Sequence, residues 1–89
     1  MPVSNTLPLA ALPAWFAQSR PDEPALICGT DVCSWAELDV RSAAVARSLV
    51  ARGVRPDDMV TIALPNGIDF VVACFAAWKA GATPQPVSS

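Results

Sequence analysis

The sequence predicts an α/β protein with three helices, a β-hairpin, and a strand–helix–strand unit that starts a parallel sheet. The unit occupies residues 59–87, which read as a β-branched strand, a Pro-Asn-Gly break, an apolar helix and a second extended segment. Units of this kind make parallel sheets. Upstream, apolar runs at residues 25–28 and 32–34 flank a Gly-Thr-Asp turn, which is typical of a hairpin.

The helix over residues 68–80 is the centre of the strand–helix–strand unit. Asn66 is expected to cap it, Asp69 lies near the positive end of its dipole, and Lys79 lies in its last turn. Gly81 is expected to end it in a left-handed conformation. The helix is apolar on nearly every side, so it should be buried on nearly every side. Its length of about 13 residues is too short for a bilayer, which takes roughly 20.

The first helix is predicted over residues 9–19. It should begin near Ala10, because Pro13 is tolerated only within the first turn. Trp15 and Phe16 are its large apolar anchors. A proline-rich stretch then ends the helix, since residues before proline avoid the helical region.

The second helix is predicted from Ser34 to about Arg52. Ser34 and Glu37 form a capping box, in which each side chain accepts the other residue's backbone N–H. Arg41 lies one turn after Glu37, which indicates a solvated face on this side, and Gly53 ends the helix. An apolar stripe with a 3.6-residue period faces the core. Its members are Leu38, Val45, Ala46, Leu49 and Val50.

Composition argues against several classes of function. The 89-residue chain is 53% apolar and 16% charged, which is too apolar for a disordered chain. Its net charge is −2 and it has no basic cluster, so we expect neither nucleic acid nor an anionic membrane as a partner. We also expect no signal peptide, no transmembrane segment and a cytoplasmic location.

The three cysteines, Cys28, Cys33 and Cys74, are expected to be free thiols. Their number is odd, and without histidine three thiols do not complete a tetrahedral zinc site. Reduced thiols are the ordinary state in a cytoplasmic protein. A disulfide between Cys28 and Cys33 across the hairpin is the alternative.

The residues by themselves indicate no reaction. Without histidine there is no Ser/His or Cys/His pair, and the four glycines fit neither the dinucleotide-binding pattern nor the phosphate loop. Asp57 and Asp58 are adjacent, but they belong to a turn that needs polar residues. We therefore predict no catalytic, cofactor-binding or metal-binding residue in this chain.

Five segments carry a family resemblance: residues 20–27, 34–39, 51–60, 64–67 and 78–84. In this order and at this spacing they resemble the N-terminus of AMP-forming acyl-CoA synthetases. These enzymes belong to the adenylate-forming superfamily, with luciferases and peptide-synthetase adenylation domains. Residues 34–38 and 78–84 match the first two core motifs of the family. The Gly-Ala-Thr-Pro-Gln-Pro-Val-Ser ending is similar to ligases of bulky acids, of the bile-acid, steroid or fatty-acid type.

The resemblance implies a parent enzyme that joins a carboxylate to ATP, releases pyrophosphate and passes the acyl group to coenzyme A. Magnesium would offset the phosphate charge during the first step. It also implies that residues 1–89 are a truncated N-terminal part of the large domain. The family's phosphate-binding loop, ribose-binding acid and carboxylate-contacting lysine would lie beyond residue 89. We therefore expect this chain to be inactive by itself.

Two other classes of function stay open. One is a stand-alone structural or self-associating module that reuses this fold, and the other is a nucleotide-binding oxidoreductase domain, which the glycine pattern argues against. The other predicted elements of the chain can cover only one side of the helix over residues 68–80. We therefore expect either a homo-oligomer or contact with the remainder of an enzyme. We expect Phe70, Val71, Cys74 or Trp78 to lie at or near the contact.

Overall fold

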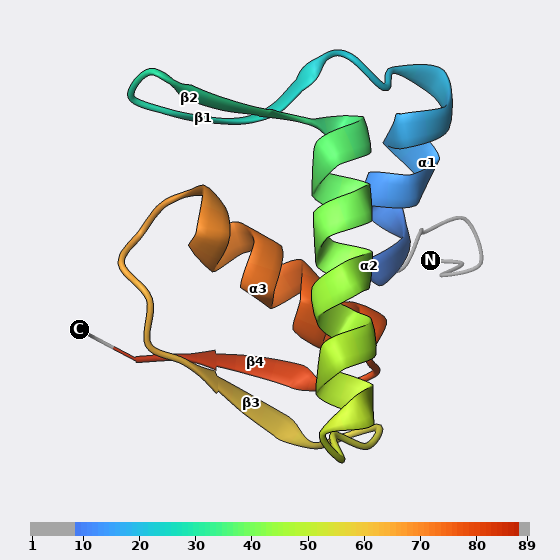
Figure 1. Ribbon diagram of the computed structural model, residues 1–89, viewed down its shortest axis with the longest axis vertical. Coiled ribbons are helices and arrows are strands. Elements are labelled where there is room, and N and C mark those ends of the chain that lie inside the picture. Colours follow the sequence, from blue (N-terminus) through green and yellow to red (C-terminus); the bar gives the residue numbers. More distant parts are fainter. Residues whose placement is uncertain (1–8, 88–89) are drawn as a thin grey trace, which may run out of the picture.

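The longest element of the fold is α2 (Trp35–Ala51), and the other elements are arranged along it (Figure 1). The structure is a computed structural model and describes residues 9–87. The 3₁₀ turn η2 (Leu9–Ala11) leads into α1 (Leu12–Ser19), which packs beside α2. Helix α3 (Ile68–Lys79) packs against α2 as well, and against both sheets.

The strands form two separate two-stranded sheets. β1 (Pro24–Cys28) and β2 (Asp31–Ser34) are antiparallel and lie at the N-terminal end of α2 (Figure 1). β3 (Met59–Ile62) and β4 (Thr83–Pro86) are parallel, and α3 connects them. The predicted α/β class, the hairpin and the strand–helix–strand unit are therefore confirmed.

The ends of the first two helices agree with local rules. Residues 9–11 are 3₁₀ rather than α-helical, and Pro13 lies in the first turn of α1 as expected. Both bonds of the predicted capping box are present at the start of α2. The Glu37 N–H donates to Ser34 Oγ at 3.1 Å, and the Ser34 N–H donates to Glu37 Oε1 at 2.9 Å.

The two ends of α3 differ in how well they were predicted. The N-cap is Gly67, with no side-chain hydrogen bond, so the prediction that Asn66 caps the helix is wrong. Asn66 comes one residue too early for its side chain to reach the first free N–H groups. At the other end, Gly81 has the predicted left-handed φ of 81°. The Ala82 N–H donates to the Ala77 carbonyl at 2.9 Å, which completes a Schellman motif.

The core lies where the hairpin, the first half of α2 and α3 meet. Cys33, Leu38 and Val72 form its buried centre. Around this centre pack Ala25, Leu26, Trp35, Ile68 and Phe75, which are partly buried. One buried apolar side chain from each of the three elements therefore contributes to the centre of the core.

The aromatic contacts of α1 correct one predicted anchor. Phe16 stacks on Trp35 of α2, with ring centroids 4.5 Å apart. Trp15 is 51% exposed, so the prediction that it anchors the helix is wrong. Trp15 precedes Phe16 by one residue, which is about 100° around the helix, so its side chain reaches solvent while that of Phe16 packs on α2. One aromatic residue thus holds α1 against α2.

The predicted apolar stripe of α2 is buried only in part. Leu38 and Ala46 are buried and Leu49 is half-buried, whereas Val45 and Val50 are exposed among the described residues. The stripe is wider than the surface that α1 and α3 cover. Part of α2 therefore presents apolar side chains to solvent.

Helix α3 is enclosed more completely than α2. Asp69 is its one exposed residue, and the others are buried or half-buried, as predicted. Cys74, one of the four residues expected at or near an outside contact, is buried within the chain. Phe70, Val71 and Trp78 are half-buried.

The capping box predicts an acid-dependent loss of stability. Hydrogen bonds from the backbone and side chain of Ser34 lower the pKa of Glu37 below its ordinary value. A lowered folded-state pKa stabilises the fold above the unfolded-state value, and this stabilisation is lost as the pH falls through the folded-state value. We expect Glu37→Gln to be less stable than the unchanged chain at neutral pH.

The difference between the two proteins should shrink on acidification, because glutamine does not titrate. Urea denaturation followed by circular dichroism, repeated at pH values from neutral to below the ordinary carboxyl pKa, measures it. A gap that stays constant over this range would show that Glu37 ionisation does not contribute.

Candidate functional site

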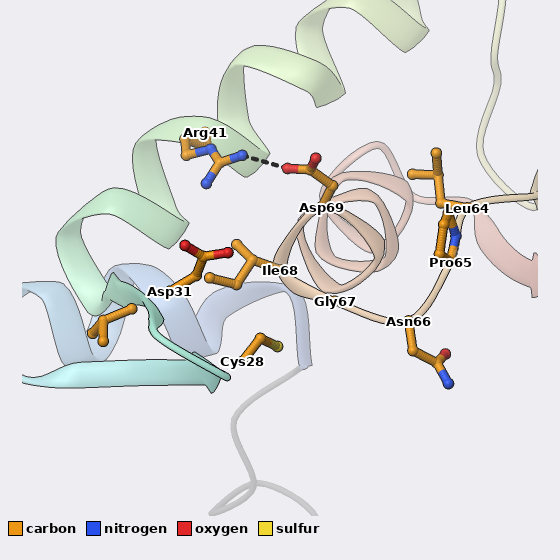
Figure 2. A pocket seen from close by; sticks show the side chains of 10 residues that line it. Cys28, Asp31, Arg41, Leu64, Pro65, Asn66, Gly67, Ile68 and Asp69 are labelled. Carbon is orange, nitrogen blue, oxygen red and sulfur yellow. Dashed lines mark hydrogen bonds and ion pairs between the residues drawn. The ribbon is translucent and has the colours of Figure 1, made fainter.

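A polar groove of about 520 Å³ lies between the tip of the hairpin, the N-terminus of α3 and the side of α2 (Figure 2). The hairpin tip supplies one wall, the loop that follows β3 supplies another, and α2 contributes a single arginine. The lining residues are Cys28, Asp31, Val32, Arg41, Leu64, Pro65, Asn66, Gly67, Ile68 and Asp69.

An ion pair crosses one side of this groove. Arg41 Nη2 lies 2.6 Å from Asp69 Oδ1 and ties α2 to the first turn of α3 (Figure 2). The two side chains are 47% and 77% exposed, so the pair contributes no more than about 1 kcal/mol. The sequence predicts that Arg41 lies near Glu37 on a solvated face. Arg41 is exposed as predicted, and its ion-pair partner is Asp69 on another helix.

The charges of the groove do not favour a phosphate group. Asp31 and Asp69 bring two carboxylates to its walls, and Arg41 already pairs with one of them. A polyphosphate would meet two like charges there. Across residues 9–87, no group of three or more His, Cys, Asp or Glu side chains is placed to hold a metal ion.

The family of the chain is evident from its sequence and fold. A family model described as AMP-binding enzyme matches residues 13–89. The chain belongs to the AMP-binding enzymes. The predicted membership of the adenylate-forming superfamily is therefore confirmed.

Individual relatives are much longer than this chain. A dimodular nonribosomal peptide synthase from Bacillus subtilis is 38% identical over 96% of the chain, which covers 4% of that protein. A salicyl-AMP ligase / salicyl-S-ArCP synthetase from Mycobacterium tuberculosis is 49% identical over 57% of the chain and 9% of its own length. The solved O-succinylbenzoate coenzyme A synthetase from Bacillus subtilis, in complex with AMP, is 31% identical with a TM-score of 0.77. It matches 84% of the chain, which covers 20% of that protein. The chain thus spans a fifth or less of each.

The two turn aspartates of the chain have structural contacts. The Asp58 carboxylate accepts the Arg55 N–H at 2.8 Å. Asp57 has a left-handed φ of 73°, and its N–H donates to the Gly81 carbonyl at 2.9 Å. Both residues therefore shape the turn that brings β3 beside β4.

Lys79 has a partner that the sequence did not reveal. Its Nζ donates to Asp39 Oδ1 at 2.6 Å and to the Asp39 carbonyl oxygen at 2.9 Å. The same carbonyl accepts the hydroxyl of the fully buried Ser42 at 3.2 Å. This cluster joins the last turn of α3 to the middle of α2. Lys79 and Asp39 are 40 positions apart, which is beyond the reach of any helical periodicity.

The three cysteines are free thiols in the structure. The register of the hairpin pairs Cys28 with Asp31 and Cys33 with Leu26, so the two cysteines lie on different rungs. Cys28 is exposed and Cys33 is buried. The alternative of a disulfide across the hairpin is therefore wrong.

The thiols should differ sharply in reactivity. Burial raises the pKa of Cys33 and of Cys74, and the thiolate is the reactive form. We expect iodoacetamide at neutral pH to label Cys28 quickly and the two buried thiols slowly. Mass spectrometry should count one label on the native chain and three in urea.

The same counts without and with a reductant would confirm that no disulfide forms. Equal rates for all three thiols in the native chain would contradict the burial of Cys33 and Cys74.

Among the helices of residues 9–87, none combines the length and the apolar character that crossing a membrane requires.

Proposed function

We propose that this chain is the N-terminal part of the large domain of an adenylate-forming ligase. Such a ligase joins a carboxylate to ATP, releases pyrophosphate and passes the acyl group to a thiol. The observation that carries the proposal is the family match over residues 13–89. The likeness to a coenzyme A synthetase in complex with AMP supports it.

The described residues do not fit ATP or its magnesium ion by themselves. The polar groove holds two carboxylates and an arginine that is already paired, and the five other arginine and lysine side chains do not line it. We therefore assign this chain a structural role in the ligase. It supplies the first parallel strands and the helices packed on them.

For the substrate, we propose a fatty acid or another bulky carboxylic acid, with coenzyme A as the acceptor. The ending of the chain supports this choice, since it is similar to that of ligases acting on such acids. The coenzyme A synthetase among the solved relatives supports the acceptor.

A second candidate is the adenylation of an amino acid or aryl acid in a peptide synthetase. The observation that favours it is the sequence similarity of the chain to a dimodular nonribosomal peptide synthase and to a salicyl-AMP ligase. Both candidates share the adenylation step and differ in the acid and in the thiol.

The chain by itself should not catalyse adenylation, because the described residues offer no phosphate-binding set. We expect pyrophosphate release from ATP to stay at the level of a buffer control with fatty, sterol, aryl and amino acids. Release that depends on an added acid would contradict the structural role.

Exchange of this segment into a relative tests the proposed function directly. We expect O-succinylbenzoate coenzyme A synthetase to keep acid-dependent pyrophosphate release when its matching segment is replaced by residues 9–87 of this chain. Because this chain would supply packing and the host would supply catalysis, the hybrid should keep the acid preference of the host. The control is the same host without the segment, which should lack activity. A folded but inactive hybrid would argue against the proposal.

A further inference from the structure

The parallel sheet of β3 and β4 has two outer edges, since each strand has a single neighbour within residues 9–87. The Thr83 N–H donates to the Asp58 carbonyl oxygen at 2.8 Å. Four residues further along each strand, the Val87 N–H donates to the Ile62 carbonyl oxygen at 3.1 Å. Backbone groups alternate in direction along a strand, so the residues between these positions include those that face each outer edge.

The outer edge of β4 lacks hydrogen-bond donors. Thr83 and Val87 face β3, so Pro84 and Pro86 face outward, and proline has no backbone N–H. Outward-facing prolines are typical of a strand that stays at the edge of a sheet. A further strand on this side would find no donor along residues 83–87.

The outer edge of β3 is open to pairing. Asp58 and Ile62 face β4, so Met59, Thr61 and Ala63 face the other way. All three are exposed, and each carries both a backbone N–H and a carbonyl oxygen. An exposed edge with donors and acceptors in alternation is a template for an added strand.

A cavity of about 380 Å³ lies along this open edge. Residues 60–64 form one wall, Val45 and Leu49 of α2 and Ala73 of α3 form the others, and no residue of β4 lines it. Among the lining residues only Thr61 is polar. An occupant therefore meets backbone hydrogen-bonding groups on one side and apolar side chains on the other.

An extended strand fits both walls of the cavity. Its backbone would exchange hydrogen bonds with Thr61 and Ala63, and every second side chain would point toward α2 and α3. An acyl chain has no groups for the open edge, and a helix uses its backbone groups internally. The edge and the cavity together therefore select a strand with apolar residues at every second position.

We propose that a β-strand from the remainder of the ligase pairs with the outer edge of β3, while β4 stays at the edge of the sheet. The proposal rests on the proposed function, which makes this chain one part of a longer enzyme. The matched segment covers only 20% of the solved coenzyme A synthetase, so most of such a ligase lies outside it. Apolar residues of the added strand cover Val45 and Leu49.

The first test is amide hydrogen exchange, read at single residues by mass spectrometry with electron-transfer fragmentation. In the chain alone, the Thr61 and Ala63 amides should exchange fast, whereas those of Val60 and Ile62, which face β4, should exchange slowly. In the hybrid with O-succinylbenzoate coenzyme A synthetase, the Thr61 and Ala63 amides should exchange roughly tenfold or more slowly than in the chain alone, because the added strand bonds them.

The second test compares Thr61→Pro with its matched control, Thr61→Val. Both remove the hydroxyl group, but only proline removes the outward N–H, and neither changes the groups that face β4. In the chain alone the two variants should have the same urea midpoint, because this N–H meets only water. In the hybrid, Thr61→Pro should unfold at a lower urea concentration than Thr61→Val.

Three results would overturn the proposal. The first is fast exchange of Thr61 and Ala63 in a hybrid whose Val60 and Ile62 amides are protected. The second is protection of Thr61 and Ala63 in the chain alone, which would mean that the edge is not open. The third is a proline variant that loses the same stability in both proteins. These measurements use no ATP and no acid, so an inactive hybrid with protected Thr61 and Ala63 amides would support the strand addition and argue against the ligase function.

Discussion

Replacing Leu38 by alanine is expected to lower the free energy of unfolding by about 2–5 kcal/mol. Leu38 is 1% exposed and lies at the centre of the core, where it packs with Cys33 and Val72. The truncation removes buried apolar surface and leaves a cavity between α2, the hairpin and α3. A domain of this size has roughly 5–15 kcal/mol of total stability, so a large share would be lost. Urea denaturation followed by far-ultraviolet circular dichroism measures the change.

The matched control is Val40→Ala, two residues further along the same helix. Val40 is exposed, so its truncation should change the unfolding free energy by no more than about 0.5 kcal/mol. Similar losses for the two variants would mean that the hairpin, α2 and α3 do not share one core. A loss confined to Leu38→Ala would show that the contacts of Leu38 in this core stabilise the fold.

Replacing Lys79 by methionine is expected to cost about 1–3 kcal/mol of unfolding free energy. The Lys79 and Asp39 side chains are only 15% and 30% exposed, so the substitution leaves a half-buried carboxylate without its cation. It also removes a donor from the Asp39 carbonyl oxygen. Methionine keeps an unbranched apolar side chain, so the loss reports on the charge and its hydrogen bonds.

The control for this variant is Arg41→Met, which breaks the exposed pair with Asp69. This pair joins the same two helices at a similar distance, yet it should contribute about 1 kcal/mol or less because solvent screens it. A double-mutant cycle with Asp39→Asn gives the coupling between Lys79 and Asp39. Equal costs for Lys79→Met and Arg41→Met would show that burial does not strengthen the bond between α2 and α3.

Much of the fold can be predicted from residues that are close together in the sequence. Ser34 and Glu37 are three residues apart, and their capping box is present as the sequence predicts. Gly81 ends α3 in the expected conformation, and the apolar run before it forms the expected helix. Each of these features depends on groups within one or two helical turns, so the residues alone decide them. The family resemblance has the same basis, because its motifs are short segments in a given order.

The candidate sites were harder to predict, because they depend on which elements meet. Arg41 bonds Asp69 28 residues away, and Lys79 bonds Asp39 40 residues away. No periodicity within a helix points to either partner. In the same way, the register of the hairpin, and not the spacing of Cys28 and Cys33, keeps the two thiols apart.

The sequence by itself determined the class of the fold, the order of its elements, the helix ends with a strong capping signal and the superfamily. The tertiary structure alone decided the partners of the charged residues, the exposure of Trp15 and which apolar side chains of α2 remain exposed. The physical reason is one of range. Backbone hydrogen bonds and caps form between near neighbours, whereas burial and ion pairs follow from how whole helices and sheets pack.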